Sequence, residues 1–134
     1  MKRNEKLLEQ CFPGHRNISL SEACFIWEQF DSICLYYDYT CSLYGSCLFG
    51  EGVDVDFLIT HYYCPRTDHL TLLEKLKASL PEAKKIGNDY FDKARGVFGT
   101  TLFTSDKHII DIVFREIKEV LTAYENPTKS KEIG

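Results

Sequence analysis

Two spacings of apolar residues along the chain predict its helices and strands. A spacing of three or four positions indicates a helix that packs on one face. The clearest helix begins at Ser19, where Ser19 and Glu22 fit a capping box, and a later one ends before Pro81, which cannot continue a helix. The predicted helices cover residues 3–12, 19–34, 67–80 and 117–124. The apolar stripe of the second helix is Leu20, Cys24, Trp27, Phe30 and Cys34.

Other segments are rich in β-favouring residues or alternate between apolar and polar positions, which predicts strands. The first of these ends at Gly45 and Ser46, and the last two form a hairpin joined by Ser105 and Asp106. The predicted strands cover residues 35–44, 53–60, 97–104 and 108–115, while residues 82–92 are ambiguous, an edge strand being one interpretation. This order of elements predicts an α/β or α+β fold, with helices packed on a mixed β-sheet.

The chain is expected to form a single domain over residues 1–134. It is long enough to bury one core, and it shows no internal repeat, low-complexity block or linker. Apolar residues make up 44% and aromatic residues 13%, which excludes the composition of a disordered chain. Only the polar tail, residues 126–134, is expected to be flexible.

Composition also indicates the environment and excludes some partners. The N-terminus lacks the apolar stretch of a secretion signal and no run approaches the ~20 apolar residues that cross a bilayer, so we expect a soluble, cytoplasmic protein outside the membrane. In that compartment the six cysteines are expected to remain thiols, most of them buried, and no pair has zinc-knuckle spacing. The net charge of -4 argues against duplex nucleic acid as a partner.

Three acidic residues interrupt strands that are otherwise apolar. Asp54 and Asp56 are two positions apart on one predicted strand, so their side chains leave the same face. Their repulsion at an effective dielectric of about 20 is on the order of 2 kcal/mol, a cost that a cation or a basic partner would offset. Asp111 repeats the pattern on a later strand, where Ile109 and Val113 share its face. One shared site for a hard divalent cation explains all three acids together.

With these acids, the segment YGSCLFGEGVDVDFLI and the later HIIDIVF resemble the DNA polymerase β-like nucleotidyltransferase superfamily. The signature of that superfamily is Gly-Ser or Gly-Gly, a spacer, Asp-x-Asp, and a third acid on a later strand. The order of elements agrees from about residue 20 to about residue 115, although about 25 residues carry the motif. The spacer departs from the pattern, because seven residues separate Ser46 from Asp54 where about ten are common.

The resemblance implies a nucleotidyltransferase-like fold and a role for each motif residue. Asp54 and Asp56 would bind two metal ions, Mg²⁺ or Mn²⁺, and Asp111 would complete the second site and help to deprotonate the acceptor. Gly45 and Ser46 would hold the triphosphate of a nucleoside triphosphate such as ATP. The implied reaction moves a nucleoside monophosphate to a hydroxyl of a small molecule, a protein or an RNA end, and releases pyrophosphate.

A different class of function stays open at this point. The short spacer, and the lack of Lys or Arg within it, also fit a non-catalytic binding or regulatory module that keeps the fold and the metal site. Members of the superfamily often recognise the acceptor with a second domain, so a partner protein or a homodimer interface would take that role here. The compact architecture is similar to minimal nucleotidyltransferases that act as antitoxins on a partner toxin.

Overall fold

The computed structural model describes residues 5–62 and 65–117, which fold as an α+β domain with helices packed on a mixed sheet. The fold class predicted from the sequence is therefore confirmed. The elements in chain order are α1 (Glu5–Cys11), β1 (Ile18–Ser19), α2 (Leu20–Tyr36), β2 (Thr40–Tyr44), the short 3-10 helix η1 (Ser46–Phe49), β3 (Glu51–Gly52), β4 (Asp54–His61), α3 (His69–Ala78), β5 (Lys84–Lys85), β6 (Tyr90–Asp92), β7 (Val97–Phe103) and β8 (Ile109–Glu116).

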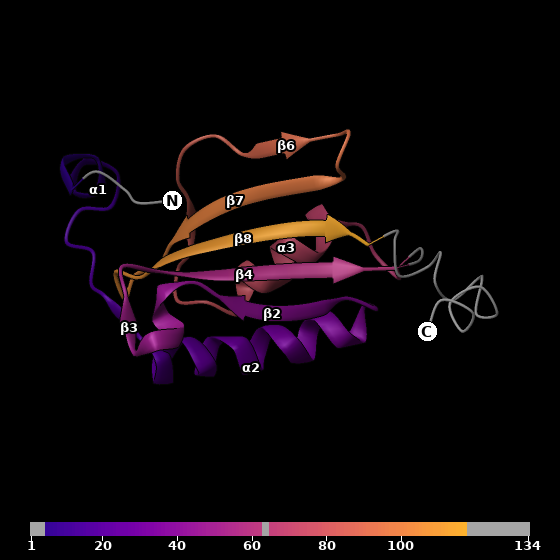
Figure 1. Ribbon diagram of the computed structural model, residues 1–134, viewed down its shortest axis with the longest axis horizontal. Helices are drawn as coiled ribbons and strands as arrows, with labels where there is room; N and C mark the ends of the chain where they lie inside the picture. Colours follow the sequence, from indigo (N-terminus) through magenta and orange to yellow (C-terminus); the bar gives the residue numbers. More distant parts are fainter. Residues whose placement is uncertain (1–4, 63–64, 118–134) are drawn as a thin grey trace, which may run out of the picture.

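The main sheet has six strands in the order β2-β4-β8-β7-β5, and β6 also pairs with β7 (Figure 1). β4 and β8 are parallel, while the other pairs are antiparallel. β1 and β3 form a separate two-stranded ribbon. Because β4 and β8 lie at the centre of the sheet, residues far apart in the sequence meet there in a fixed register.

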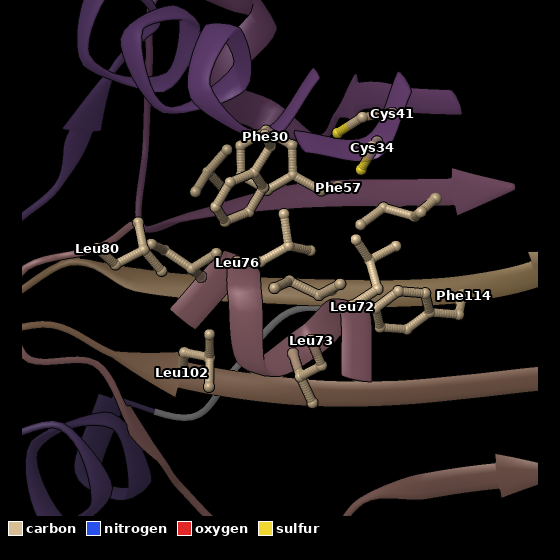
Figure 2. Packing of buried hydrophobic residues seen from close by; sticks show 14 of the residues in the cluster. Phe30, Cys34, Cys41, Phe57, Leu72, Leu73, Leu76, Leu80, Leu102 and Phe114 are labelled. Atoms are coloured by element: carbon tan, nitrogen blue, oxygen red, sulfur yellow. The ribbon is translucent and has the colours of Figure 1, made fainter. Parts of the chain in front are cut away.

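One face of the sheet packs against α2 and α3 and forms the main hydrophobic core (Figure 2). Alternate side chains of the two central strands point into this core. They are Val55, Phe57, Ile59, Ile110, Ile112 and Phe114. The helices contribute residues such as Phe30, whose ring centroid lies 4.9 Å from that of Phe57. The intervening positions of β4 and β8, which include all three acids, therefore lie on the opposite face.

The opposite face is partly covered by α1, which packs over one end of it. Leu8 and Phe12 form a second hydrophobic cluster with Ile109, which is fully buried although it lies on this face. The ring of Phe12 stands edge-on to that of Phe103, with centroids 5.4 Å apart. The three acids lie beyond this cluster and stay partly exposed.

The two edges of the sheet differ. At the β2 edge, α2 lies alongside the strand, and the indole nitrogen of Trp27 donates a hydrogen bond of 2.9 Å to the Cys41 carbonyl oxygen. At the other edge the strands are the short β5 and β6, so the ambiguous segment 82–92 contains two edge strands rather than one.

Two predictions for the second helix are wrong in detail. The strand expected over residues 35–44 begins only at Thr40, because α2 continues to Tyr36 and the chain turns at Asp38, whose φ is +66°. The predicted apolar stripe is also shifted: Cys24 is exposed, and Ala23 is the residue of that turn that is buried. Cysteine and alanine occupy adjacent positions and are both compatible with a core, so the spacing alone did not choose between them.

The remaining predicted elements agree with the structure or lie outside it. The helix predicted over residues 67–80 is α3, which Asp68 caps by accepting a hydrogen bond of 2.7 Å from the Thr71 amide. The hairpin is formed by β7 and β8. The closing helix over residues 117–124 and the tail over 126–134 lie outside the described residues, apart from Ile117. Of the five cysteines described, three are buried and two are exposed.

Among the helices in the described part of the chain, none has the length and apolar composition to span a membrane.

We expect Phe30→Ala to lower the free energy of unfolding by about 3–5 kcal/mol, because truncating a fully buried Phe leaves a cavity in a packed core. Urea denaturation followed by circular dichroism measures the change. Phe25→Ala is the matched control: Phe25 lies on the same helix with 64% of its surface exposed, and its loss should cost less than about 1 kcal/mol. Equal losses for the two variants would contradict the assigned core.

Candidate metal centre

The three acids predicted from the sequence lie together on the open face of the sheet. Asp54 and Asp56 project from the same side of β4, and Asp56 is the register partner of Asp111 on the parallel strand β8. One carboxylate oxygen of each residue lies within 4.8 Å of those of the other two. Three oxygen donors at this spacing could hold a metal ion.

The charge of Asp56 is disfavoured by its surroundings. Partial burial, followed by the nearby carboxylates of Asp54 and Asp111, raises the pKa of Asp56 to about 6. A carboxylate held among other carboxylates gains little from the protein itself when it ionises. A cation bound by all three residues would reverse this effect, since the opposite charge favours the ionised form.

A hydrogen bond from β7 orients the third acid. The Thr101 hydroxyl donates to Oδ1 of Asp111 over 2.5 Å, and the two residues are register partners on the antiparallel strands β7 and β8. Thr101 was not singled out in the sequence, although pairing the predicted strands 97–104 and 108–115 from end to end sets it opposite Asp111. The bond restricts rotation of the Asp111 carboxylate, as outer partners of metal ligands commonly do.

The glycine-serine bend lies directly against these acids. Gly45 has φ +96° and ψ -173°, a conformation open almost only to glycine. A side chain at this position would also collide with the carboxylate of Asp56, because an added Cβ would overlap Oδ2. Gly45 therefore serves two needs at once, a backbone turn at the end of β2 and close approach to Asp56.

The short spacer between the bend and the acids folds into compact structure. Residues Ser46–Phe49 form η1, Gly50 turns the chain with φ +125°, and β3 leads directly into β4. Gly52 permits this tight return, since an added Cβ there would lie 2.5 Å from the Ser46 Oγ and 2.9 Å from the Cys47 amide nitrogen. The seven residues between Ser46 and Asp54 are thus enough to close the loop, and the start of η1 lies beside Asp56.

The residues around the bend differ in exposure. Ser46 is exposed, whereas Cys47 is fully buried, and its thiol lies 3.7 Å from the Tyr44 carbonyl oxygen. Burial, and then the charge of Asp56, raises the pKa of the Cys47 thiol. Cys47 is therefore a small apolar anchor for η1, and Ser46 is the exposed polar residue of the bend.

All five residues predicted for the site, Gly45, Ser46, Asp54, Asp56 and Asp111, are thus gathered at one place on the sheet. No protein-family model matches the chain, and a search of curated proteins finds no match. The case for a functional site therefore depends on the geometry of these residues.

We expect Asp56→Asn to stabilise the metal-free protein at pH 8 by about 1 kcal/mol, because it removes a charge from a cluster of like charges. The pKa of Asp56 in the folded protein, about 6, is above its ordinary value of 3.8. The stabilising contribution of the protonated group is therefore complete below about pH 4 and is lost as the pH rises through 6. Thermal unfolding in the presence of a chelator should show a gain at pH 8 that disappears at pH 4.

The exposed Glu28 on α2 provides the control, since Glu28→Gln should leave the pH dependence of the unfolding temperature unchanged. A gain for Asp56→Asn that is equal at both pH values would show that Asp56 is not electrostatically crowded.

We expect Gly45→Ala to weaken Mn²⁺ binding by at least about tenfold, because the new methyl group displaces the Asp56 carboxylate. Gly50→Ala is the matched control: Gly50 also has a positive φ, but an added Cβ there meets nothing within 4 Å. Both variants should lose about 1–3 kcal/mol of stability from backbone strain, whereas only Gly45→Ala should change the Mn²⁺ affinity measured by titration calorimetry. Equal affinities for the two variants would separate Gly45 from the metal centre.

Proposed function

We propose that the protein is a metal-dependent nucleotidyltransferase that moves a nucleoside monophosphate from a nucleoside triphosphate to a hydroxyl acceptor. The observation that supports this proposal most strongly is the convergence of Asp54, Asp56 and Asp111, from two central strands, beside a glycine bend that contacts Asp56. The residues of the resemblance noted in the sequence are the same ones that meet in space.

The donor set suits Mg²⁺ or Mn²⁺, which prefer carboxylate oxygens combined with the phosphates of a substrate. Asp54, Asp56 and Asp111 would hold the ions. When bound, the ions would stabilise negative charge on the attacking oxygen, the leaving oxygen and the phosphoryl group between them. The raised pKa of Asp56 supports this assignment, because the nearby carboxylates of Asp54 and Asp111 disfavour its charge and a bound cation would favour it.

The bend at Gly45 and Ser46 would bind the triphosphate. The first N–H groups of a helical turn receive no partner from the turn itself, and η1 begins at Ser46, directly after the contact between Gly45 and Asp56. Backbone N–H groups and the exposed Ser46 hydroxyl would donate hydrogen bonds to phosphate oxygens. The pyrophosphate that leaves would thus be held on the β2 side of the acids.

The transfer step balances with the residues in these roles. The acceptor hydroxyl oxygen forms a bond to the α-phosphorus, and the bond between that phosphorus and the bridging oxygen of pyrophosphate breaks. Pyrophosphate leaves with the electron pair, and the hydroxyl proton passes to Asp111. The Thr101 hydroxyl, bonded to Asp111 Oδ1, would keep this carboxylate oriented toward the acceptor.

A label-transfer assay tests the proposal. The donors are ATP and the other nucleoside triphosphates, each with a labelled α-phosphate, supplied with Mg²⁺ or Mn²⁺. The assay measures label that appears on the protein itself, on extract proteins or on RNA. Each of Asp54→Asn, Asp56→Asn and Asp111→Asn should lower the rate by about 100-fold or more, since each removes an ion ligand. Asp106→Asn should retain the full rate, and circular dichroism should show that all the variants fold.

If the wild-type protein moves no label to any acceptor, catalysis is contradicted. Retained binding of Mg²⁺ with nucleotide would then assign the protein to the non-catalytic class, as a binding or regulatory module that acts on a partner protein.

A further inference from the structure

A hollow lies on the side of the acids that faces away from the glycine bend. Its volume is about 300 Å³, and Asp56 and Asp111 form its inner rim. The other lining residues are Asn88, Tyr90, Gly99, Thr100, Thr101, Ile112 and Val113. They come from β8, β7, β6 and the segment that leads into β6. The roles assigned above to the acids and the bend do not use this space.

The shape of the hollow depends on a glycine and an aromatic ring. Gly99 pairs with Tyr90 on one side and with Val113 on the other, so the three residues share the open face. An added Cβ at Gly99 would lie 3.6 Å from Tyr90 Cβ and 3.8 Å from Val113 Cγ2, and any longer side chain would extend into the hollow. Tyr90 is 58% exposed and forms a wall above this floor.

The order of elements across the sheet gives the hollow a direction relative to the reaction. The bend follows β2, Asp54 and Asp56 lie on β4, Asp111 lies on β8, and the hollow extends over β7 toward β6. An in-line displacement requires the attacking oxygen to approach from the side opposite to the leaving group. With pyrophosphate on the β2 side, the attacking hydroxyl must enter from the hollow.

We infer that this hollow is the acceptor site, and that it selects a compact, uncharged compound whose hydroxyl lies on or beside a flat ring. The inference rests on the proposed function for the direction of attack. The exposed ring of Tyr90 offers a stacking surface, and the Asn88 amide, which is exposed, offers both a donor and an acceptor.

Charge and size decide the class of acceptor. Of the described residues, none that lines the hollow is Lys or Arg, whereas a nucleic-acid end needs basic contacts along its phosphates. The acids nearest to Tyr90 on its own segment are already paired: Asp89 with Lys85 at 3.1 Å and Asp92 with Arg95 at 3.6 Å. A hollow of this size, at the lower end for small-molecule sites, suits one or two rings.

The test uses three matched probes on the full chain labelled with ¹⁵N, without metal or nucleotide. N-acetyltyrosinamide carries a ring and a hydroxyl, N-acetylserinamide lacks the ring, and the phosphate ester of the first adds charge. The tyrosine probe should shift the NMR signals of Gly99 and Thr101. The serine probe should bind at least about tenfold more weakly, since one aromatic stacking contact is worth on the order of tenfold in affinity. The phosphate ester should also bind at least about tenfold more weakly, since Asp56 and Asp111 repel its added negative charge. Equal or tighter binding of the serine probe or the phosphate ester would overturn the inference, as would unmoved Gly99 and Thr101 signals.

Variants of β6 locate the binding. Tyr90→Ala should lower the affinity of the protein for the tyrosine probe by about tenfold, and Tyr90→Phe should lower it by less than about twofold. Phe91→Ala is the control, because Phe91 is as exposed as Tyr90 but lies on the other face, where its ring contacts Phe98. Unchanged affinity in a folded Tyr90→Ala protein would overturn the inference.

A competition experiment with a nucleotide separates this inference from the proposed function. Mg²⁺ with a non-hydrolysable ATP analogue should leave the tyrosine probe bound, because donor and acceptor occupy opposite sides of the acids. Displacement of the probe by the analogue would assign the hollow to the donor nucleotide instead and overturn the inference. The probe can fail while label transfer succeeds, or bind while no transfer occurs, so each idea fails by its own measurement.

Discussion

The parallel pairing of β4 with β8 is the constraint on which the rest of the site depends. It aligns Asp56 with Asp111, and a shift of one residue would turn one of these acids toward the helices and expose its apolar neighbours. The buried alternate positions of both strands hold this register, because Val55, Phe57 and Ile112 have a core to fill on one face only. The hydrophobic packing of one side therefore positions the chemistry of the other.

This arrangement separates stability from function within a single sheet. The face under α2 and α3 is apolar and buried, whereas the open face carries the acids, the glycine bend and the hollow. Three carboxylates at close range work against folding. The central strands tolerate them because their other sides are among the most deeply buried parts of the described chain. The burial of the apolar side chains of β4 and β8 thus offsets the electrostatic repulsion among the acids on the same strands.

Much of this could be predicted from the sequence, because strand alternation reports faces directly. The alternation predicted that Asp54 and Asp56 would share one face of their strand and that Asp111 would share its face with Ile109 and Val113, and the structure agrees. Strand periodicity says nothing of which strands are neighbours, so the parallel pairing that joins Asp56 to Asp111 required the three-dimensional structure. The positions of Gly52 and Gly99 required it as well, since each glycine is explained by a residue that is close in space but separated from it along the chain.

The predicted C-terminal boundary of α2 was wrong for a different reason. Leu35 and Tyr36 have β-favouring or apolar side chains, yet both are exposed in the last turn of a helix. Their conformation follows from the helix that precedes them rather than from their own burial. Local preference lost to the continuation of an established helix, which is where single-sequence reasoning is weakest.

The indole of Trp27 at the β2 edge has a consequence for self-association. An unprotected outer strand offers its peptide groups as a template on which another chain can add a strand. Here a helix runs along that border and its indole occupies one of the carbonyls, while the opposite border consists of two short segments, one of them a pair of lysines, Lys84 and Lys85. Both borders of the described sheet are thereby less open to the addition of a further strand than a long, bare edge strand would be.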